Sequence, residues 1–371
     1  MSLLQKKEAF RKFIDQNKIL VFDDPGPRRS SLVEALGIIG APKSLTYTTT
    51  TIEEALSIVN DKKISLIFAA SHTTDGSGLR LFQALKESAL SESLVLILLT
   101  TSAQETALAR GLEEIVDAGL AFPFTNDSLQ STLISALTLK LQPTSYLEAI
   151  FQSKSMMHEG KNVDAIEMLM FAETLSQQPA LALYYRGKAY LALSDLDAAQ
   201  SSFTKGLLLN KLHYRCLTGL YEVLVQKERF YEAYDTLKKI CQAYPTTAEQ
   251  LTLVIRLAIQ TENYADMSLY FKLSKPFPRG FPVLENYLGS GLFISGKYHL
   301  LRGETATAFN LFSKALQVAG TQTKVLRAVI TELSENNLIH EAEQFLQQIP
   351  DKVKTSEEFK SIEQLLVNSK G

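Results

Sequence analysis

The sequence predicts an α/β domain followed by an all-α domain. Up to residue 141, short apolar runs of strand length alternate with segments whose apolar residues recur at helical spacing. Beyond residue 145 the strand-like runs stop, and paired helical segments recur with a period of about 34 residues. The length of 371 residues also suits two or three domains. We therefore expect a doubly wound parallel sheet of five strands, followed by an α-solenoid of about six helix pairs.

The order of these elements gives the expected domain boundaries. We expect an N-terminal helix over 1–16, an α/β domain over 17–141, a linker over 142–145, a repeat array over 146–356 and a C-terminal capping helix over 357–371. The predicted strands cover 19–22, 44–50, 64–70, 94–99 and 120–122, and the predicted helices cover 30–39, 52–59, 79–90, 102–118 and 127–141. The N-terminal helix has an apolar face that includes Phe10 and Ile14, which packing on the repeats or a homodimer would bury.

Composition argues against several classes of protein. The 38 Lys and Arg residues balance 40 Asp and Glu residues, for a net charge of −2, so we expect no nucleic-acid partner. The apolar runs are too short to cross a membrane and the N-terminus is too polar for a secretory signal, so we expect no membrane association and a cytoplasmic location. Cys216 and Cys241 lie in helical patterns and are expected to be buried thiols. Without a Gly-rich phosphate loop, a metal-spaced His or Cys cluster, or a nucleophile with a base, we expect neither enzymatic activity nor a cofactor.

Sites in doubly wound sheets lie at the carboxyl ends of the strands. The residues predicted to lie there are Asp23 and Asp24 after the first strand, Ala70 at the end of the third, Thr100 after the fourth, and Phe122 and Pro123 at the end of the fifth. An acidic pair at such an edge suits a magnesium ion, although two carboxylates alone hold magnesium weakly. The alternative is that both Asp residues only cap the turn after their strand, and that Thr100 is an ordinary strand-end residue.

These residues carry a resemblance to the receiver domains of two-component response regulators. The run from Lys18 to Asp24 resembles the first strand and acidic pair of that family, and Phe122-Pro-Phe-Thr125 resembles its Lys-Pro-Phe-Thr segment. The resemblance covers 17–141 and implies a flavodoxin-like fold. In the family, three carboxylates hold a divalent cation, the Asp that ends the third strand accepts a phosphoryl group, a Ser or Thr acts as the switch residue, and a Lys neutralises the product.

Two of those parts are absent here. Ala70 stands in the place of the phosphoacceptor Asp, and Phe122 stands in the place of the Lys, while Thr100 matches the switch residue. The resemblance therefore implies a pseudo-receiver that keeps the fold without the phosphorylation chemistry. Asp75, a few residues further along, is the alternative acceptor, and His72 is either a phosphate ligand or an exposed loop residue.

The repeats begin near residues 146, 180, 214, 248, 289 and 323. The twentieth place of each repeat is small in five of six cases, and the residue four places later is always large and apolar, so that two helices can approach and interlock. The twentieth-place residues are Ala165, Ala199, Ala233, Met267, Ala308 and Ala342, and the residues four places later are Leu169, Phe203, Leu237, Phe271, Phe312 and Leu346. This pattern resembles the tetratricopeptide repeat. The proline-rich segment 275–282 shifts the repeat by seven residues and is expected to bend or break the array locally.

Such repeats stack so that their first helices line a concave groove. The predicted groove combines cations with aromatic rings: Phe151, Lys154, Tyr184, Tyr185, Lys188, Arg215, Arg256, Phe293, Lys297 and Arg327. This mixture suits an acidic or amphipathic segment of a protein partner. The alternative is that these are solvated helix residues and that the rings serve only the packing of the repeats.

The hypothesis that follows is a non-enzymatic adaptor of bacterial two-component (phosphorelay) signal transduction. A phosphorylation-deficient receiver domain would dock a sensor kinase or another receiver domain, and the repeat groove would hold a second protein. Two alternatives differ in class. One is a phosphorylatable response regulator whose receiver controls the repeats, and the other is a sensor that binds a small ligand at the strand ends.

Overall fold

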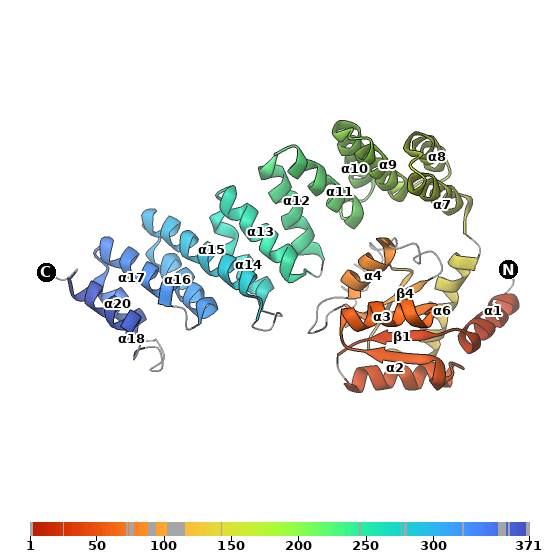
Figure 1. Cartoon of the computed structure of the whole chain (residues 1–371), viewed down its shortest axis with the longest axis horizontal. Helices are drawn as coiled ribbons and strands as arrows, with labels where there is room; N and C mark the ends of the chain where they lie inside the picture. Colours follow the sequence, from red (N-terminus) through yellow and green to blue (C-terminus); the bar gives the residue numbers. More distant parts are fainter. Residues whose placement is uncertain are drawn as a thin grey trace. The chain divides into compact units, whose positions relative to one another are not determined.

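The computed structural model describes residues 3–24, 26–71, 73, 78–87, 94–101, 116–141, 143–244, 246–275, 277, 280–320, 323–347, 354 and 357–368. The chain divides into two compact units, Met1–Thr247 and Ala248–Gly371. The first unit contains a five-stranded sheet and the first helix pairs of the repeat array, and the second unit contains the remaining helices (Figure 1). The predicted order, an α/β domain and then helical repeats, is confirmed.

The sheet is parallel throughout and has the order β2-β1-β3-β4-β5. Its strands are β1 (Ile19–Phe22), β2 (Thr46–Thr49), β3 (Leu66–Ala70), β4 (Val95–Thr100) and β5 (Ala118–Ala121). The three central strands β1, β3 and β4 are buried at every position, which explains their uninterrupted apolar runs. The strand order reverses between β1 and β3, so Asp23 and Ala70 follow neighbouring strands at the crevice where ligands of such sheets bind.

Helices cover both faces of the sheet. They are α2 (Gly26–Ile38), α3 (Ile52–Lys62), α4 (Gly78–Glu87) and α6 (Asn126–Leu141). Leu36 of α2 and Leu133 of α6 share one core with Val21 and the other strand residues that point to the same face. On the opposite face α3 contacts β1, and α4 contacts β3 and β4, so that β1 lies between α2 and α3 in Figure 1.

The N-terminal helix belongs to the core of the α/β domain. Helix α1 (Leu3–Gln16) packs against α6, and Phe10 and Ile14 are each only 1% exposed within the core that α2 and α6 form. Phe10 and Ile14 are therefore buried within their own domain and not against the repeats, and neither side chain is available to a homodimer interface. When helices cover both faces of a sheet, the outer sides of those helices remain partly exposed. Helix α1 covers part of the outer side of α6.

Two predicted element boundaries in the α/β domain are also wrong. Most of the helix predicted over 102–118 lies outside the described residues, but its last residues are not helical, and β5 begins at Ala118 rather than at residue 120. The cause is Asp117. Its carboxylate accepts a hydrogen bond from the N–H of Leu96 at 2.7 Å, and its own N–H donates to the carbonyl of Leu96 at 2.8 Å. This pairing brings the chain alongside β4 three residues earlier than the apolar pattern indicates.

The repeats of the first unit begin close to the predicted residues. Their helices are α7 (Ser145–His158), α8 (Asn162–Thr174), α9 (Ala180–Ala192), α10 (Leu196–Leu209), α11 (Tyr214–Gln226) and α12 (Phe230–Ala243). Side chains cap three of the N-termini: Thr144, Asp195 and His213 each accept a hydrogen bond from the N–H three residues on. Cys216 and Cys241 are buried free thiols, and burial raises the pKa of Cys241 to about 12.

The second unit continues the helix pairs, with one change of register. It contains α13 (Ala248–Gln260), the short 3₁₀ helix η3 (Tyr264–Asp266), α14 (Met267–Ser274), α15 (Pro282–Leu301), α16 (Thr305–Ala319), α17 (Thr323–Glu335), α18 (Ile339–Gln347) and α20 (Glu357–Asn368). The fifth repeat was predicted near residue 289, but α15 begins at Pro282, because proline fits the first position of a helix. Both α13 and α14 contact α15, so the stack continues across the proline-rich segment. Helix α20 covers α17 and α18 with Phe359, Ile362 and Leu366.

The small and large positions of the repeat interlock in the core. All six residues at the twentieth place are 0% exposed: Ala165, Ala199, Ala233, Met267, Ala308 and Ala342. For two of the large residues four places later, Phe203 and Phe312, glycines of neighbouring helices make room for the ring. A Cβ on Gly187 or Gly219 would lie 2.4 or 2.5 Å from the ring of Phe203, and a Cβ on Gly296 would lie 2.5 Å from that of Phe312.

This close packing predicts opposite effects of two Gly→Ala substitutions within α15. Gly296→Ala should lower the free energy of unfolding by about 1–3 kcal/mol, because the buried ring of Phe312 cannot move without loss of packing. Gly289→Ala is the matched control, since its Cβ would lie 3.9 Å from the nearest side-chain atom, and better helix propensity should make it neutral or stabilising by up to about 1 kcal/mol. Urea denaturation followed by circular dichroism measures both, and equal effects would contradict the interlock.

Candidate functional site

Asp23, the first residue of the acidic pair at the end of β1, is paired with an arginine of the same chain, and Arg29 reaches the backbone carbonyl of Asp24 at 3.4 Å. Asp23 is fully buried, and the Nε of Arg28 donates to its Oδ2 at 2.8 Å while an Nη of the same guanidinium pairs with its Oδ1. Arg29 donates to the backbone carbonyl of Asp23 at 2.6 Å. The first turns of α2 place both arginines beside the strand end, and bidentate pairing is the strongest geometry available to a carboxylate and a guanidinium.

The other residues predicted at the strand ends close this edge of the sheet. Ala70 is 1% exposed and is covered by Gly78, where a Cβ would lie 2.5 Å from the Ala70 carbonyl oxygen. Thr100 is also buried and donates to the carbonyl of Leu120 at 3.5 Å. Phe122, next to Pro123, packs edge-to-face on Phe124 at a centroid distance of 5.7 Å. A cavity of about 10 Å³ remains among Asp23, Arg28, Leu32, Leu99, Thr100, Phe122 and Phe124.

The described residues do not fit the magnesium ion that the receiver resemblance implies. Both carboxylate oxygens of Asp23 are engaged by Arg28, and Ala70 supplies no oxygen from its side chain. Within the described ranges, no three His, Cys, Asp or Glu side chains cluster closely enough to hold a metal. The remaining cavity has room for about one water molecule, so these residues leave no space for a small ligand either. Two of the predicted alternatives, Asp75 and His72, lie outside the described residues.

The Asp23–Arg28 pair yields a prediction on stability. Arg28→Ala should lower the free energy of unfolding by about 3 kcal/mol, because it leaves the buried charge of Asp23 without a partner. Arg11→Ala, on the exposed side of α1, is the control and should change stability by less than about 0.5 kcal/mol. In denaturant titrations the double variant Asp23→Ala, Arg28→Ala should lose less than the sum of the two single variants. Additive losses would show that the pair is not coupled.

The second candidate site is a groove in the first unit, lined by the first helices of three successive repeats. It has a volume of about 630 Å³. Its walls come mainly from α7, α9 and α11, with Asn162 at the start of α8: Lys154, Met157, His158, Asn162, Tyr184, Tyr185, Lys188, Ala192, Tyr214, Arg215, Thr218, Gly219 and Glu222. We call this surface the first-unit groove. Five of the ten predicted groove residues lie in it: Lys154, Tyr184, Tyr185, Lys188 and Arg215.

Cations and rings are in direct contact at the centre of this groove. Tyr184 and Tyr185 pack edge-to-face with centroids 5.0 Å apart. The guanidinium of Arg215 lies 5.3 Å and 5.7 Å from the two ring centroids and donates to the hydroxyl of Tyr185 at 2.7 Å. The Nζ of Lys154 lies 5.9 Å from the centroid of Tyr185. The two tyrosine rings thus lie against the side chains of two cations in the groove, Lys154 and Arg215, and cation–π contact holds these cations in place.

A third cation of the groove is paired, but loosely. The Nζ of Lys188 lies 3.3 Å from a carboxylate oxygen of Glu222, one repeat further along, and their side chains are 37% and 46% exposed. An ion pair this accessible to water contributes less than about 1 kcal/mol. A carboxylate of a ligand could therefore replace Glu222 as the partner of Lys188 at little cost.

The remaining predicted groove residues lie elsewhere. Phe151 is half-buried on α7, outside the residues that line the first-unit groove, and the other four belong to the second unit. There Arg256 is exposed on α13, whereas Phe293 packs on Phe312 at 5.8 Å. Lys297 pairs with Glu332 at 2.7 Å, and this hydrogen bond and the charge of Glu332 raise the pKa of Lys297. Arg327 donates to Ser361 of α20 at 2.7 Å. Phe293, Lys297 and Arg327 thus serve contacts within the second unit.

Sequence reasoning missed two kinds of residue at these sites. The Asn162 and His158 side chains enter the first-unit groove from the turn of the first repeat, and Thr218 enters it two turns before the end of α11. His158 and Asn162 are not repeated one period later, so no periodic signal marks them, whereas Thr218 takes the same place in its repeat as Tyr184 and its position carried a periodic signal. Arg28 was missed as well, although its signal was present: two adjacent arginines at the start of a helix five residues after a buried Asp.

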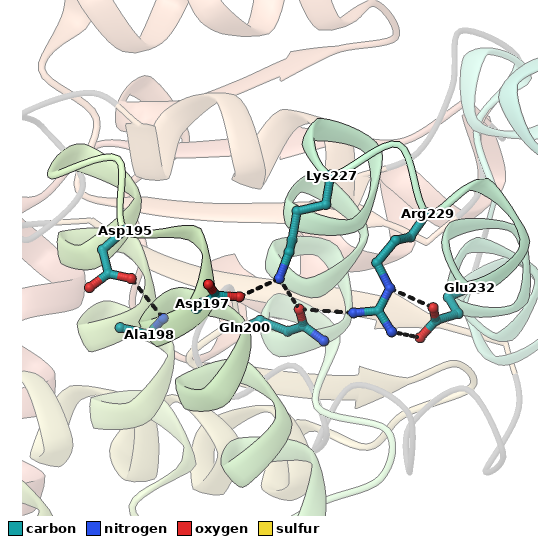
Figure 2. Close-up of polar contacts among 7 residues, drawn as sticks. All are labelled: Asp195, Asp197, Ala198, Gln200, Lys227, Arg229 and Glu232. Carbon is teal, nitrogen blue, oxygen red and sulfur yellow. Dashed lines mark hydrogen bonds and ion pairs between the residues drawn. The ribbon is translucent and has the colours of Figure 1, made fainter.

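A polar network ties the second repeat to the third (Figure 2). Lys227, at the end of α11, donates to the carboxylate of Asp197 at 2.5 Å and to Gln200 Oε1 at 2.8 Å, both on α10. Arg229 reaches the same oxygen of Gln200 at 3.2 Å and pairs with Glu232. The hydrogen bond from Lys227 lowers the pKa of Asp197. The network fixes the turn between α11 and α12 against α10, and so fixes the wall that α11 contributes to the groove.

No family model matches the sequence, and no curated protein matches it. Similar solved structures include a tetratricopeptide repeat protein from Parabacteroides merdae, with 17% identity, 61% of this chain and 92% of that chain covered, and a TM-score of 0.34. MamA from Desulfovibrio magneticus RS-1 shows 18% identity, covers 48% of this chain and 96% of its own, and has a TM-score of 0.31. PilF from Pseudomonas aeruginosa shows 17% identity, with 59% of this chain and 96% of its own chain covered and a TM-score of 0.30. At TM-scores this low the similarities carry no argument, and the repeat architecture follows from the helix pairs of the chain itself.

None of the helices within the described part of the chain is long and apolar enough to cross a membrane.

Proposed function

We propose that the protein is a non-enzymatic adaptor whose first-unit groove binds a segment of a partner protein. The observation that carries this proposal is the groove of about 630 Å³, in which Tyr184 and Tyr185 of α9 and Arg215 of α11 form one contact cluster. Rigid aromatic rings and arginine are the residue types that contribute most to binding at protein interfaces. They are held here by helices, so little conformational entropy is lost when a ligand binds.

The charge of the groove selects an acidic segment. Lys154, Lys188 and Arg215 line it against the single carboxylate of Glu222. Carboxylates of an extended or helical peptide would pair with Lys154 and Arg215, while apolar parts of its side chains would cover the two tyrosine rings. An acidic surface on a partner protein would use the same contacts.

We further propose that the α/β domain is a pseudo-receiver that acts in two-component signalling by docking a sensor kinase or another receiver domain. The strand order, the acidic pair after β1 and the Phe122-Pro123 segment support the relationship. The buried Ala70 and the engagement of Asp23 by Arg28 support the loss of phosphorylation. Buried free thiols suit the reducing cytoplasm, where such signalling proteins act.

The first test of the groove reverses one charge. Lys154→Glu should weaken the binding of a fluorescein-labelled polyglutamate peptide about tenfold, because an attraction becomes a repulsion. Lys211→Glu is the matched control, since Lys211 is an exposed lysine in the turn before α11 and is not part of the groove lining. Fluorescence anisotropy at fixed ionic strength measures both affinities. An equal loss in the two variants would mean that the peptide senses only net charge.

A second substitution in the same groove should have the opposite sign. Glu222→Gln removes the partner of Lys188 and should tighten binding of the same peptide about two- to fivefold, as expected from the loss of a competing pair worth under about 1 kcal/mol. Glu228→Gln is the control, an exposed carboxylate in the turn after α11. If Glu222→Gln leaves affinity unchanged or weakens it, Lys188 does not contact the peptide.

The pseudo-receiver proposal predicts that no phosphoryl group is transferred to the chain. Intact mass spectrometry after incubation with acetyl phosphate and magnesium should show no mass gain, whereas a phosphorylatable receiver domain treated in parallel should gain one phosphoryl group. A gain that disappears in the variant Asp23→Asn, Asp24→Asn would instead establish a phosphorylated switch. A gain that survives in this variant would point to an acceptor elsewhere, with Asp75 the first to replace.

A further inference from the structure

The second unit contains a smaller pocket with an apolar floor. It has a volume of about 250 Å³ and lies where α14, the start of α15 and the end of α16 meet. Leu284 and Leu288 are 4% and 2% exposed at its base, and the rings of Phe277 and Phe281 pack edge-to-face at 6.0 Å. We call this the second-unit pocket. Val318 of α16 closes its far side.

One lysine lies over the ring of Phe271, which lines this pocket, and two more lie at the end of α14. The Nζ of Lys314 lies 5.6 Å from the centroid of that ring and donates to Ser268 at 3.2 Å. Lys275 lines the pocket itself, and Lys272 follows Phe271 directly on α14. Burial lowers the pKa of Lys314, and the charges of Lys272 and Lys275 lower it further. Lys272 and Lys275 are therefore both close enough to Lys314 to repel its charge.

No carboxylate among the described residues neutralises this cluster. Lys272, Lys275 and Lys314 form no ion pair with a described residue. Glu285 lines the pocket, but its Oε1 accepts a hydrogen bond from the backbone N–H of Gly280 at 3.0 Å, which fixes it at the start of α15. Repulsion among cations beside an apolar surface lowers the stability of the free protein, and a ligand with negative charges would relieve it.

We propose that the second-unit pocket is a separate binding site for an acidic peptide segment, which inserts one bulky apolar side chain between Phe277, Phe281 and Leu288 while its neighbouring carboxylates pair with Lys272, Lys275 and Lys314. The apolar side chain gains by burial against the leucines and rings, at about 25 cal/mol per Å² of apolar surface. The carboxylates supply charge-assisted hydrogen bonds at the rim. This site differs from the first-unit groove, because it requires an apolar side chain as well as charge.

The size and lining of the pocket favour a peptide over two other ligands. About 250 Å³ is below the usual volume of pockets for drug-sized molecules, roughly 300–1,000 Å³, but it accommodates an apolar side chain. Inorganic phosphate would use the lysines and leave the apolar floor empty. The apolar floor therefore distinguishes a peptide from inorganic phosphate, since only a peptide gains binding energy from contact with it.

Photo-crosslinking locates the site directly. The probe is a peptide with a benzophenone-bearing phenylalanine flanked on both sides by glutamates, incubated with the full chain, irradiated and mapped by mass spectrometry. Crosslinks are expected in 271–288 and 317–318 of the wild-type chain. The variant Lys272→Glu, Lys275→Glu should reduce their yield at least tenfold, because both lysines are exposed and their reversal changes charge without touching the core.

Two controls keep the outcome decisive. The variant Lys324→Glu, Lys360→Glu reverses two exposed lysines on α17 and α20 and should leave the yield unchanged. A competing peptide with alanine in place of the apolar residue should not displace the probe, and inorganic phosphate should not displace it at matched ionic strength. Crosslinks confined to the first-unit groove, no crosslinks, or crosslinks that survive the reversal of Lys272 and Lys275 would each overturn the proposal. Crosslinks in the second unit that are lost on charge reversal would support it whether or not the first-unit groove binds.

Discussion

The first-unit groove depends on the contact between one phenylalanine and two glycines. Phe203 of α10 fits against Gly187 of α9 and Gly219 of α11, at distances that leave no space for a Cβ on either glycine. The ring therefore fixes how closely these helices approach. Tyr184 packs on Phe203 at 6.0 Å, and Arg215 lies over Tyr184, so the geometry of the groove follows from the packing beneath it. A residue that looks purely structural thus sets the distance between the functional side chains.

At the sheet edge a different constraint operates. Asp23 is buried where a charge is stable only with a partner, and Arg28 from the next helix supplies that partner. A carboxylate shared with a metal ion would exchange with solvent and ligand, whereas one held by two bonds from its own chain does not. Among the described residues of this edge, Phe122, Ala70 and the Asp23–Arg28 pair form a closely packed surface with a cavity of only about 10 Å³.

The fold was largely predictable from the sequence, because both of its periods are expressed in apolar residues. The buried strands and the alanines at the twentieth place of each repeat are positions where burial leaves little choice of residue. The elements whose positions were predicted wrongly depend on polar groups or on chain geometry instead. Asp117 moves β5, Pro282 starts a helix where a break was expected, and α1 covers α6. No periodic pattern encodes these interactions.

The site was less predictable, since position in a repeat does not determine the partner of a charge. Lys188 and Lys297 both occupy the ninth place of their repeats, and each meets a Glu of the following repeat. Yet the side chain of Glu222 is 46% exposed, whereas that of Glu332 is only 7% exposed. The Lys188–Glu222 pair can therefore open to a ligand, while the Lys297–Glu332 pair lies at the edge of the core. Burial of the acidic partner, and not the presence of the lysine, therefore decides where along the array a cation is available. The same rule applies to Lys272, Lys275 and Lys314 near Phe271, which form no ion pair with a described residue and which we therefore propose as partners for the carboxylates of a ligand.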